Sequence, residues 1–295
     1  MEKGRIIKAY AGYYYVLSFE NNKIYETKLR GRFRQEDFDF YVGDKVKFSV
    51  IDEKEETGVI EGLLPRATKL DRPAVANVDQ VVLVFASQQP ELNYRLLDRF
   101  LLLVEAYEFE VLICLNKMDL VGLEKAKELM ANYVDIGYRV VYTSAENNQG
   151  LSELKKELQN RLSVLAGPSG VGKSSLLNQL SPEAEMAVDE VSQKIKRGKH
   201  TTRHVELITL DNSGLVVDTP GFTSLNIDFI TKRELVYFFR EMKEYISKCK
   251  FNDCLHFHEP KCRIKQAVQE GEIAQSRYDS YLNFLSEIEG EDDQW

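Results

Sequence analysis

Short runs that alternate between apolar and polar residues occupy about the first 65 residues of the chain. Turn formers such as Gly12 and Asn21-Asn22 separate these runs, as is typical of strands joined by tight turns. The expected strands are residues 5–9, 13–17, 23–26, 45–50 and 57–60. Five short strands in this length predict a small closed β-barrel. An OB-fold is favoured, although an SH3-like barrel gives a similar pattern.

From about Asp79 the pattern changes to uninterrupted apolar runs, typical of strands buried on both faces, which alternate with helical segments. A helix is expected between residues 92 and 107, where leucines recur at helical spacing. The expected strands are residues 80–85, 110–115, 139–142, 163–166, 205–210 and 215–217. This alternation predicts an α/β doubly wound sheet.

Beyond about Thr231 the sequence favours helices, so we expect three parts in the chain. Residues 1–68 are predicted to form the barrel, residues 69–230 the α/β domain, and residues 231–295 a small helical domain. The chain has 295 residues, of which 43% are hydrophobic, and this is enough for more than one buried core.

A phosphate-binding loop is predicted directly after the strand at residues 163–166. The segment matches G-x-x-x-x-G-K-[ST] in every fixed position and precedes a helix expected over residues 175–180. Its glycines let backbone N–H groups turn toward phosphate oxygens, and the helix N-terminus adds positive potential. Lys173 is expected to reach the β- and γ-phosphates as a catalytic group, and Ser174 to coordinate Mg²⁺. The candidate nucleotide contacts here are Gly167, Pro168, Ser169, Gly170, Val171, Gly172, Lys173, Ser174 and Ser175.

The nucleotide base is predicted from a second motif, which follows the strand at residues 110–115. Asn116-Lys117-Met118-Asp119 matches the guanine-binding pattern N-K-x-D. The aspartate accepts hydrogen bonds from guanine N1–H and the exocyclic amino group, which adenine does not offer there. Sites of this kind discriminate by about 10⁴-fold or more. Ser144 and Ala145, after the next strand, resemble the backbone element that contacts guanine O6, so the motifs together predict GTP binding.

Elements further along the chain indicate GTP hydrolysis. Asp218 and Gly221 belong to a D-x-x-G motif, in which the aspartate holds Mg²⁺ through water and the glycine N–H contacts the γ-phosphate. A polar, basic segment upstream contains Thr201 and Thr202. We favour Thr202 as the switch threonine that closes over Mg²⁺ in the GTP state.

The residue that usually orients the attacking water is absent from this sequence. Many GTPases have glutamine directly after the D-x-x-G glycine, and this chain has Phe222 there, which cannot orient water. His200, beside the switch threonines, is therefore the catalytic candidate, with a solvated loop histidine as the equally weighted alternative. The absence of the glutamine predicts slow intrinsic turnover that a partner accelerates.

The motifs occur in a circularly permuted order. The guanine motifs come first, near residues 116 and 144, and the phosphate loop begins at residue 167. The switch threonine and the D-x-x-G motif follow it, near residues 202 and 218. An ordinary small GTPase has the phosphate loop first and the guanine motifs last. We therefore expect the same sheet with its chain ends moved elsewhere.

Three of the four cysteines lie within fourteen residues of the C-terminal part. Cys249, Cys254 and Cys262, with a histidine between them, form a Cys₃His set suited to one tetrahedral Zn²⁺. No coordination position is left open, so the predicted zinc is structural. Both His256 and His258 fit as the fourth ligand on spacing alone.

The formal net charge of −8 argues against indiscriminate binding to nucleic acid, but local basic patches occur. The clearest lies between two expected barrel strands, where OB-folds present nucleic-acid-binding loops. Its candidate RNA-binding residues are Lys28, Arg30, Arg32 and Arg34. A solvated hairpin is nearly as well supported by the sequence.

The motif order and the cysteine cluster closely resemble the bacterial ribosome small-subunit-dependent GTPase A family, and the resemblance covers nearly the whole chain. It implies an OB-fold barrel, a GTP-hydrolysing core and a late role in maturing the 30S subunit through contact with 16S rRNA. It also favours His256 over His258 as the fourth zinc ligand, and it favours rRNA binding as the role of the basic patch.

Two other functions are weighed against this one. A GTP-regulated RNA-binding module with incidental hydrolysis is suggested by the missing glutamine, and a metabolic kinase or ATPase is disfavoured by the guanine motif. No run approaches the length of about 18 apolar residues needed to cross a membrane, and no signal-type segment follows Met1. A cytoplasmic monomer that binds GTP and GDP, without a membrane partner, is therefore expected.

Overall fold

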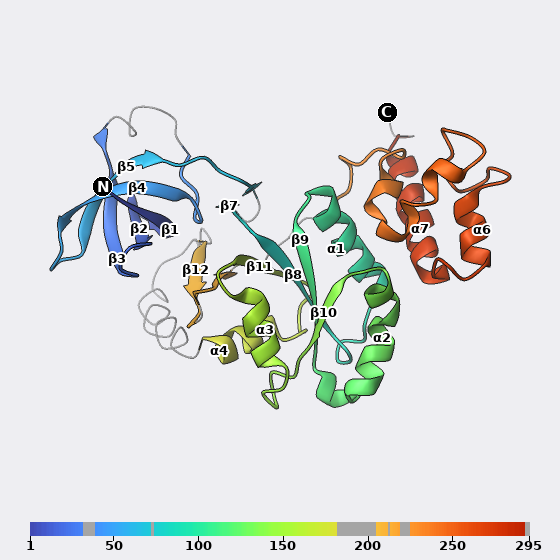
Figure 1. Ribbon diagram of the computed structural model, residues 1–295, viewed down its shortest axis with the longest axis horizontal. Coiled ribbons are helices and arrows are strands. Elements are labelled where there is room, and N and C mark those ends of the chain that lie inside the picture. The colour runs from blue at the N-terminus through green and yellow to red at the C-terminus, as the bar shows by residue number, and fades with distance from the viewer. Residues whose placement is uncertain (32–38, 72–73, 182–204, 212, 219–224, 293–295) are drawn as a thin grey trace.

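The structure is a computed structural model that describes residues 1–31, 39–71, 74–181, 205–211, 213–218 and 225–292. Figure 1 shows three parts in chain order: an N-terminal barrel, a central α/β domain and a helical C-terminal domain. This architecture confirms the predicted fold class. No described helix has both the length and the apolar composition needed to span a membrane.

The barrel closes through the pairing of its first strand with two others. β1 pairs antiparallel with β2 and also with β4, while β3 runs parallel to β5. This order, β1-β2-β3-β5-β4 and back to β1, is that of an OB-fold. Alternate residues point inward, so the interior is filled by a small apolar cluster that includes Ile6, Val16, Phe48 and Ile60. The strands are β1 Glu2–Tyr10, β2 Tyr13–Ser18, β3 Ile24–Leu29, β4 Lys45–Asp52 and β5 Thr57–Leu63.

A second sheet region forms the central domain, with the order β10-β9-β8-β11-β13-β12. The first five strands run parallel, and β12 is antiparallel to β13. The strands are β8 Gln80–Ala86, β9 Glu110–Asn116, β10 Arg139–Tyr142, β11 Leu162–Ala166, β12 Glu206–Thr209 and β13 Leu215–Asp218. A two-stranded ribbon, β6 Lys69–Asp71 with β7 Ala74–Ala76, joins this domain to the barrel. The connection order is permuted, as predicted from the motifs.

Helices cover both faces of the central sheet, which explains the uninterrupted apolar strands. In β8, for example, Val81 and Leu83 belong to one buried cluster, and Val82 and Val84 belong to the cluster on the other face. The helices are α1 Tyr94–Ala106, α2 Leu123–Asp135, α3 Leu151–Leu158 and α4 Lys173–Leu180. A short 3₁₀ turn, η2 Met118–Leu120, follows β9.

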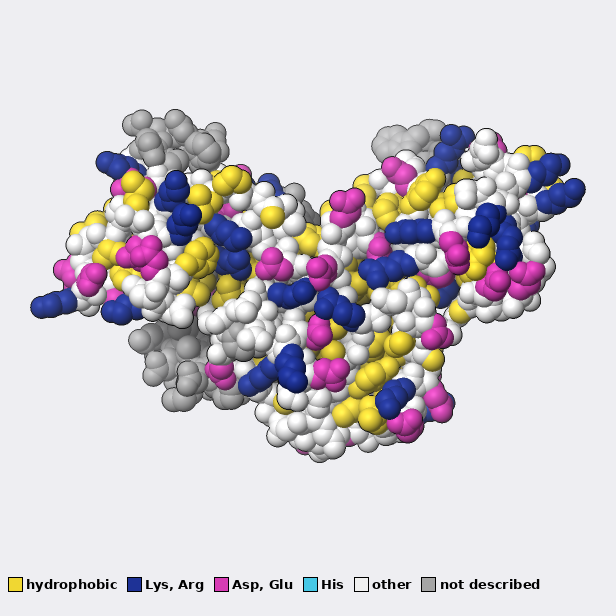
Figure 2. All heavy atoms as spheres, viewed as in Figure 1, with side chains coloured by type: hydrophobic (Ala, Val, Ile, Leu, Met, Phe, Trp, Pro, Cys, Tyr) yellow, Lys and Arg dark blue, Asp and Glu magenta, His cyan; other side chains and the backbone are white. Residues whose placement is uncertain are grey.

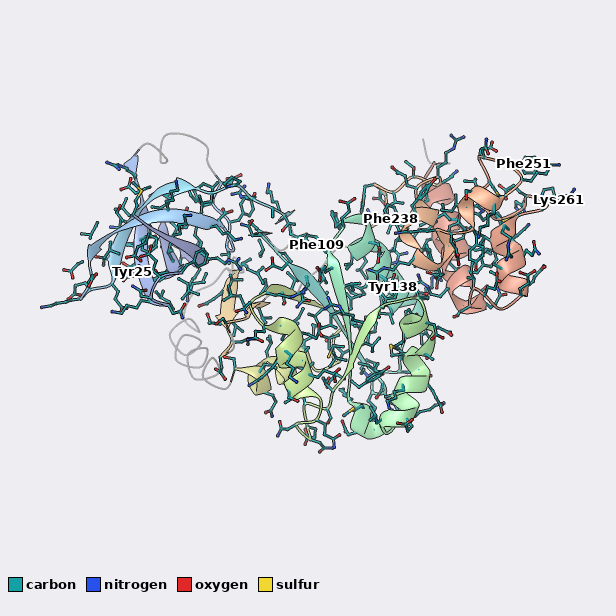
Figure 3. All side chains as sticks on the ribbon, in the orientation of Figure 1. Tyr25, Phe109, Tyr138, Phe238, Phe251 and Lys261 are labelled. Carbon is teal, nitrogen blue, oxygen red and sulfur yellow. The ribbon has the colours of Figure 1, made fainter. Side chains whose placement is uncertain are left out.

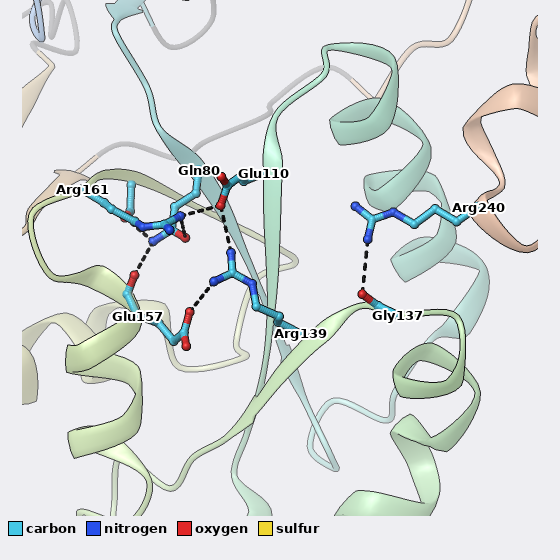
Figure 4. Close-up of polar contacts among 8 residues, drawn as sticks. Gln80, Glu110, Gly137, Arg139, Glu157, Arg161 and Arg240 are labelled. Carbon is cyan, nitrogen blue, oxygen red and sulfur yellow. Dashed lines mark hydrogen bonds and ion pairs between the residues drawn. The ribbon is translucent and has the colours of Figure 1, made fainter.

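Charged side chains close the amino-terminal edge of the parallel strands (Figure 4). Glu110 of β9 forms ion pairs with Arg139, at 3.1 Å, and with Arg161, at 2.5 Å. The hydrogen bond from Arg161 lowers the pKa of Glu110. Arg139 also pairs with Glu157 of α3 at 2.7 Å. The two described arginines at this edge are therefore already paired with carboxylates.

The C-terminal domain has its own buried cluster and packs on α1 of the central domain. It consists of the 3₁₀ turns η3 Leu235–Phe238, η4 Arg240–Met242 and η5 Ile246–Lys248, and the helices α6 Arg263–Gln269 and α7 Gln275–Asp292. Arg277 of α7 forms a buried ion pair with Asp98 of α1 at 2.7 Å. Figure 3 places Tyr138 and Phe238 near this junction, and Phe251 and Lys261 at the outer end of the domain.

Candidate nucleotide site and metal centre

The predicted nucleotide motifs meet at the carboxyl edge of the central sheet. They follow β9, β10 and β11, and ligands of open α/β sheets bind at this edge. A cleft of about 570 Å³ lies there, within the usual range for ligand sites. It is lined by Gln89, Asn116, Lys117, Asp119, Leu120, Ala145, Glu146, Gly172, Ser175, Asn178 and Gln179.

Asn116 joins the three predicted nucleotide loops. Its side-chain amide donates to the carbonyl of Val171 in the phosphate loop at 2.9 Å. Its Oδ1 accepts from Thr143 Oγ1 at 3.0 Å and from the N–H of Ala145 at 3.2 Å. The side chain is buried, so these bonds are shielded from water. The guanine motif and the phosphate loop are therefore held in fixed relative positions.

The side chain of Lys117 links the turn after β8 to the phosphate loop. It lies in the left-handed region (φ 59°), which is uncommon for lysine. Its ammonium donates to the carbonyl of Gly170 at 2.7 Å and also to that of Gln89. Ser87 Oγ donates to the carbonyl of Lys117 at 2.7 Å. Sequence reasoning missed Ser87 and Gln89, because nothing in the turn after β8 marks it as part of a nucleotide site.

Asp119 lines the cleft with an exposed carboxylate that has no hydrogen-bond partner among the described residues. The neighbouring Met118 is buried, and its N–H donates to the carbonyl of Thr143 at 3.0 Å. Ser144 is buried, and Glu146 is an unpredicted member of the cleft lining. The unpaired carboxylate fits a ligand that offers two adjacent N–H donors.

The phosphate loop has glycine at two crowded positions, Gly167 and Gly172. A Cβ on Gly167 (φ 140°) would lie 2.0 Å from the carbonyl oxygen of Val84. The ammonium of Lys173 donates to the carbonyls of Gly167 and Pro168, each at 2.7 Å. Burial lowers the pKa of Lys173. Lys173 is thus directed into the loop, where the sequence predicts phosphate oxygens.

Gly172→Ala is expected to abolish nucleotide binding, because its Cβ would lie 2.4 Å from Nδ2 of Asn116. Gly122→Ala is the matched control. Both glycines have positive φ (95° and 83°), but a Cβ at Gly122 meets no atom within 4 Å. Calorimetric titration with GDP measures the effect. Equal GDP affinities in the two variants would show that the Asn116 contact does not matter.

Several predicted residues cannot be placed in this cleft. His200, Thr201, Thr202, Gly221 and Phe222 lie outside the described residues, and so does the side chain of Asp218, which ends β13. Ser174 and Ser175 are described, and both lie exposed in the first turn of α4, where Ser175 lines the cleft. The roles of all these residues therefore stay predictions.

The predicted metal ligands converge in the C-terminal domain. Donor atoms of Cys249, Cys254, His256 and Cys262 all lie within 4.8 Å of one another. Cys249 Sγ lies 3.9 Å from Cys262 Sγ, and His256 Nδ1 lies 3.5 Å and 3.4 Å from these two sulfurs. His258 is not in the group, and its ring instead contacts that of Phe257, with the centroids 3.6 Å apart.

These separations fit a tetrahedral zinc ion. Zn–S and Zn–N bonds of about 2.3 Å and 2.0 Å imply edges of about 3.8 Å between sulfurs and 3.5 Å between sulfur and nitrogen. Burial raises the pKa of Cys254 to about 12, so a cation is needed to favour its thiolate. Tyr278 donates to the carbonyl of His256 at 2.6 Å, and Glu259 accepts from the N–H of Leu255 at 2.7 Å. These hydrogen bonds fix the backbone around His256, so the four donor atoms are held at separations that suit a metal ion.

Two of the four predicted RNA-binding residues are described. Lys28 is exposed on β3, with its ammonium 4.6 Å from the ring centre of Tyr13. Arg30 forms an ion pair with Glu61, which reduces its availability for phosphate. Arg32 and Arg34 lie outside the described residues.

Comparisons with known proteins agree with this geometry. Residues 63–228 match the family described as RsgA GTPase, and residues 3–60 match the RsgA N-terminal domain. The chain is 49% identical to the small ribosomal subunit biogenesis GTPase RsgA of Alkaliphilus metalliredigens, with 98% of each chain covered. It is 48% identical to the protein of that name from Bacillus velezensis, again with 98% of each covered.

Two solved structures have the same fold. YloQ, described as a circularly permuted GTPase, matches with a TM-score of 0.83 at 42% identity, covering 99% of this chain and 96% of its own. YjeQ from Thermotoga maritima matches with a TM-score of 0.83 at 39% identity, covering 98% and 99%. The matches extend over the barrel, the central domain and the C-terminal domain.

Proposed function

The chain belongs to the RsgA GTPase family and hydrolyses GTP, and from this premise we propose that it acts in late maturation of the small ribosomal subunit. Membership of a GTPase family decides against a kinase or ATPase. The observation that best supports the site is the convergence of the guanine motif and the phosphate loop on Asn116. Because small subunits mature in the bacterial cytoplasm, the proposal places the chain there. The monomeric state stays a prediction.

The proposed chemistry is mostly positioning and charge stabilisation. Lys173 binds the β- and γ-phosphates, and Asp119 with Ala145 fixes the base. When Mg²⁺ is bound it neutralises phosphate charge, and Ser174 and Thr202 would hold it. His200 would orient the attacking water in place of the usual glutamine.

A structural zinc ion is also part of the proposal. The Cys₃His set leaves no position for a substrate, so the metal would stabilise the loop-rich segment between η5 and α6. Purified protein should contain one zinc per chain by atomic emission, and Cys262→Ser should lose it. Retention of zinc by Cys262→Ser, or another stoichiometric metal, would contradict this assignment.

Contact with 16S rRNA through the barrel completes the proposal. Lys28 would contribute a cation that binds phosphate, and the adjacent ring of Tyr13 would contribute a surface on which a base can stack. The relatives are named for biogenesis of the small ribosomal subunit, which supports this partner. Double charge reversal, Lys28→Glu with Arg30→Glu, should weaken binding to small subunits and reduce its salt dependence.

The deciding experiment is GTP turnover with and without purified 30S subunits, with 50S subunits as the control. We expect 30S alone to accelerate turnover by about tenfold or more, because part of the catalytic machinery is missing from the free chain. His200→Ala should reduce the accelerated rate. Unchanged turnover with GTP-dependent 30S binding intact would instead support a GTP-regulated RNA-binding module.

A further inference from the structure

A second cleft lies along strand β10, and it shares no lining residue with the nucleotide cleft. Among the described strands, the two edges of the central sheet are β12 and β10. The barrel covers β12, because Lys8 of β1 pairs in register with Glu206 and donates to its carboxylate at 3.0 Å. In the part of the chain that the structure describes, β10 pairs with β9 alone. Helices α2 and α3 flank it and form the walls of a cleft of about 590 Å³.

The floor of this cleft offers backbone hydrogen-bonding groups. Thr143 donates its N–H toward β9, to the carbonyl of Leu115 at 2.9 Å. Backbone directions alternate along a strand, so the groups of Val140 and Tyr142 point away from β9. Gly150 covers the carbonyl of Tyr142, since a Cβ there would lie 1.9 Å from the oxygen. Among the described residues nothing bonds to the N–H and C=O of Val140 or to the N–H of Tyr142, so these groups are available to an added strand.

The α2 wall of the cleft carries apolar side chains between the charged residues Lys127 and Asp135. Ala131 and Val134 of α2 lie on this wall, and Val134 is 48% exposed. Figure 2 shows hydrophobic side chains exposed on the face where Figure 1 places α2 and β10. This wall fits apolar side chains on alternate residues of an extended segment.

The charges that are not already paired in the cleft are negative. Its two cations each have a carboxylate partner, since Lys127 forms an exposed pair with Glu124 at 2.9 Å and Arg139 pairs with carboxylates including Glu157. By contrast, Asp135 on the α2 side and Glu153 on the α3 side have no ion-pair partner among the described residues. Carboxylates in these positions repel nucleic-acid phosphates and attract lysine or arginine.

We propose that this cleft binds an extended basic segment of a small-subunit protein, which adds as a strand beside β10. The inference rests on the proposed function. The small subunit consists of RNA and of proteins rich in basic residues, and the unpaired carboxylates of Asp135 and Glu153 favour the protein. The segment alternates apolar residues, which face Val134, with lysine or arginine, which faces Glu153.

Photo-cross-linking tests the occupant directly. The full chain, with Val134 replaced by benzoylphenylalanine, is bound to purified 30S subunits with a non-hydrolysable GTP analogue, irradiated and analysed by mass spectrometry. The expected product joins position 134 to a peptide of a subunit protein with alternating basic and apolar residues. Cross-links only to rRNA, only to a second copy of this chain, or to nothing would overturn the proposal.

Charge reversal supplies an independent measurement. Glu153→Lys should suppress the cross-link and weaken 30S affinity by about threefold to tenfold, as expected for reversing one exposed ion pair. Glu108→Lys, in the exposed turn between α1 and β9, is the matched control and should change neither. Intrinsic GTP turnover should stay unchanged in both. Failure of the unmodified chain to bind 30S would reject the proposed function, whereas binding without the cross-link would reject this cleft alone.

Discussion

The substitution Asp119→Asn should transfer the nucleotide preference from GTP to XTP. The carboxylate of Asp119 lines the nucleotide cleft and has no protein partner among the described residues, so guanine is expected to supply both of its hydrogen bonds. An asparagine offers one acceptor and one donor, and its donor would face the amino group of guanine. We expect kcat/KM for GTP to fall by about 10³-fold or more, the scale for a mispaired buried contact.

Xanthine restores the match, because it has a carbonyl oxygen where guanine has the amino group. The variant should therefore hydrolyse XTP with a kcat close to that of the unmodified enzyme with GTP, since the phosphate loop is unchanged. Glu146→Gln removes another carboxylate from the same cleft and serves as the control for charge. Steady-state turnover with both nucleotides measures the exchange. If Asp119→Asn kept its GTP preference, the base would be read by another group.

The sequence predicts this part of the site well because each motif directly follows a strand. Once the apolar runs at β9 and β11 are recognised, the carboxyl edge of a parallel sheet brings their following loops together. Asn116 then falls beside Val171 although 55 residues separate them. Clustering along the chain predicts the three cysteine ligands, which lie within fourteen residues, but spacing leaves His256 and His258 open, and the structure groups His256 with the cysteines.

Contacts between residues without a motif escape this reasoning. Gln89 accepts from Lys117 through a backbone carbonyl, which any residue possesses, so its identity gives no signal. Arg277 is an arginine on an amphipathic helix and would ordinarily be placed in solvent. Its partner Asp98 is 179 residues away, and only the packing of α7 on α1 brings them together. The cleft along β10 likewise depends on which strand lies at the sheet edge.

The substitution Arg277→Ala should destabilise the protein at the junction between the C-terminal and central domains. Arg277 and Asp98 are 2% and 1% exposed, and Arg277 also pairs with Glu241 at 2.6 Å. Asp98 further accepts a hydrogen bond from Tyr133 of α2 at 2.8 Å. Removal of the guanidinium leaves two buried carboxylates without their cation. Breaking a buried pair in this way costs about 3–5 kcal/mol of unfolding free energy.

Arg263→Ala is the matched control. It also removes an arginine with two carboxylate partners, at 2.8 Å and 2.7 Å, but that side chain is 22% exposed and water can replace the lost contacts. Urea unfolding followed by circular dichroism should show a large fall in midpoint for Arg277→Ala and a small one for Arg263→Ala. The triple replacement Asp98→Asn, Glu241→Gln and Arg277→Met should recover part of the loss, because no uncompensated charge stays buried. Equal midpoints for the two single variants would mean that apolar packing, rather than this ion-pair cluster, joins the domains.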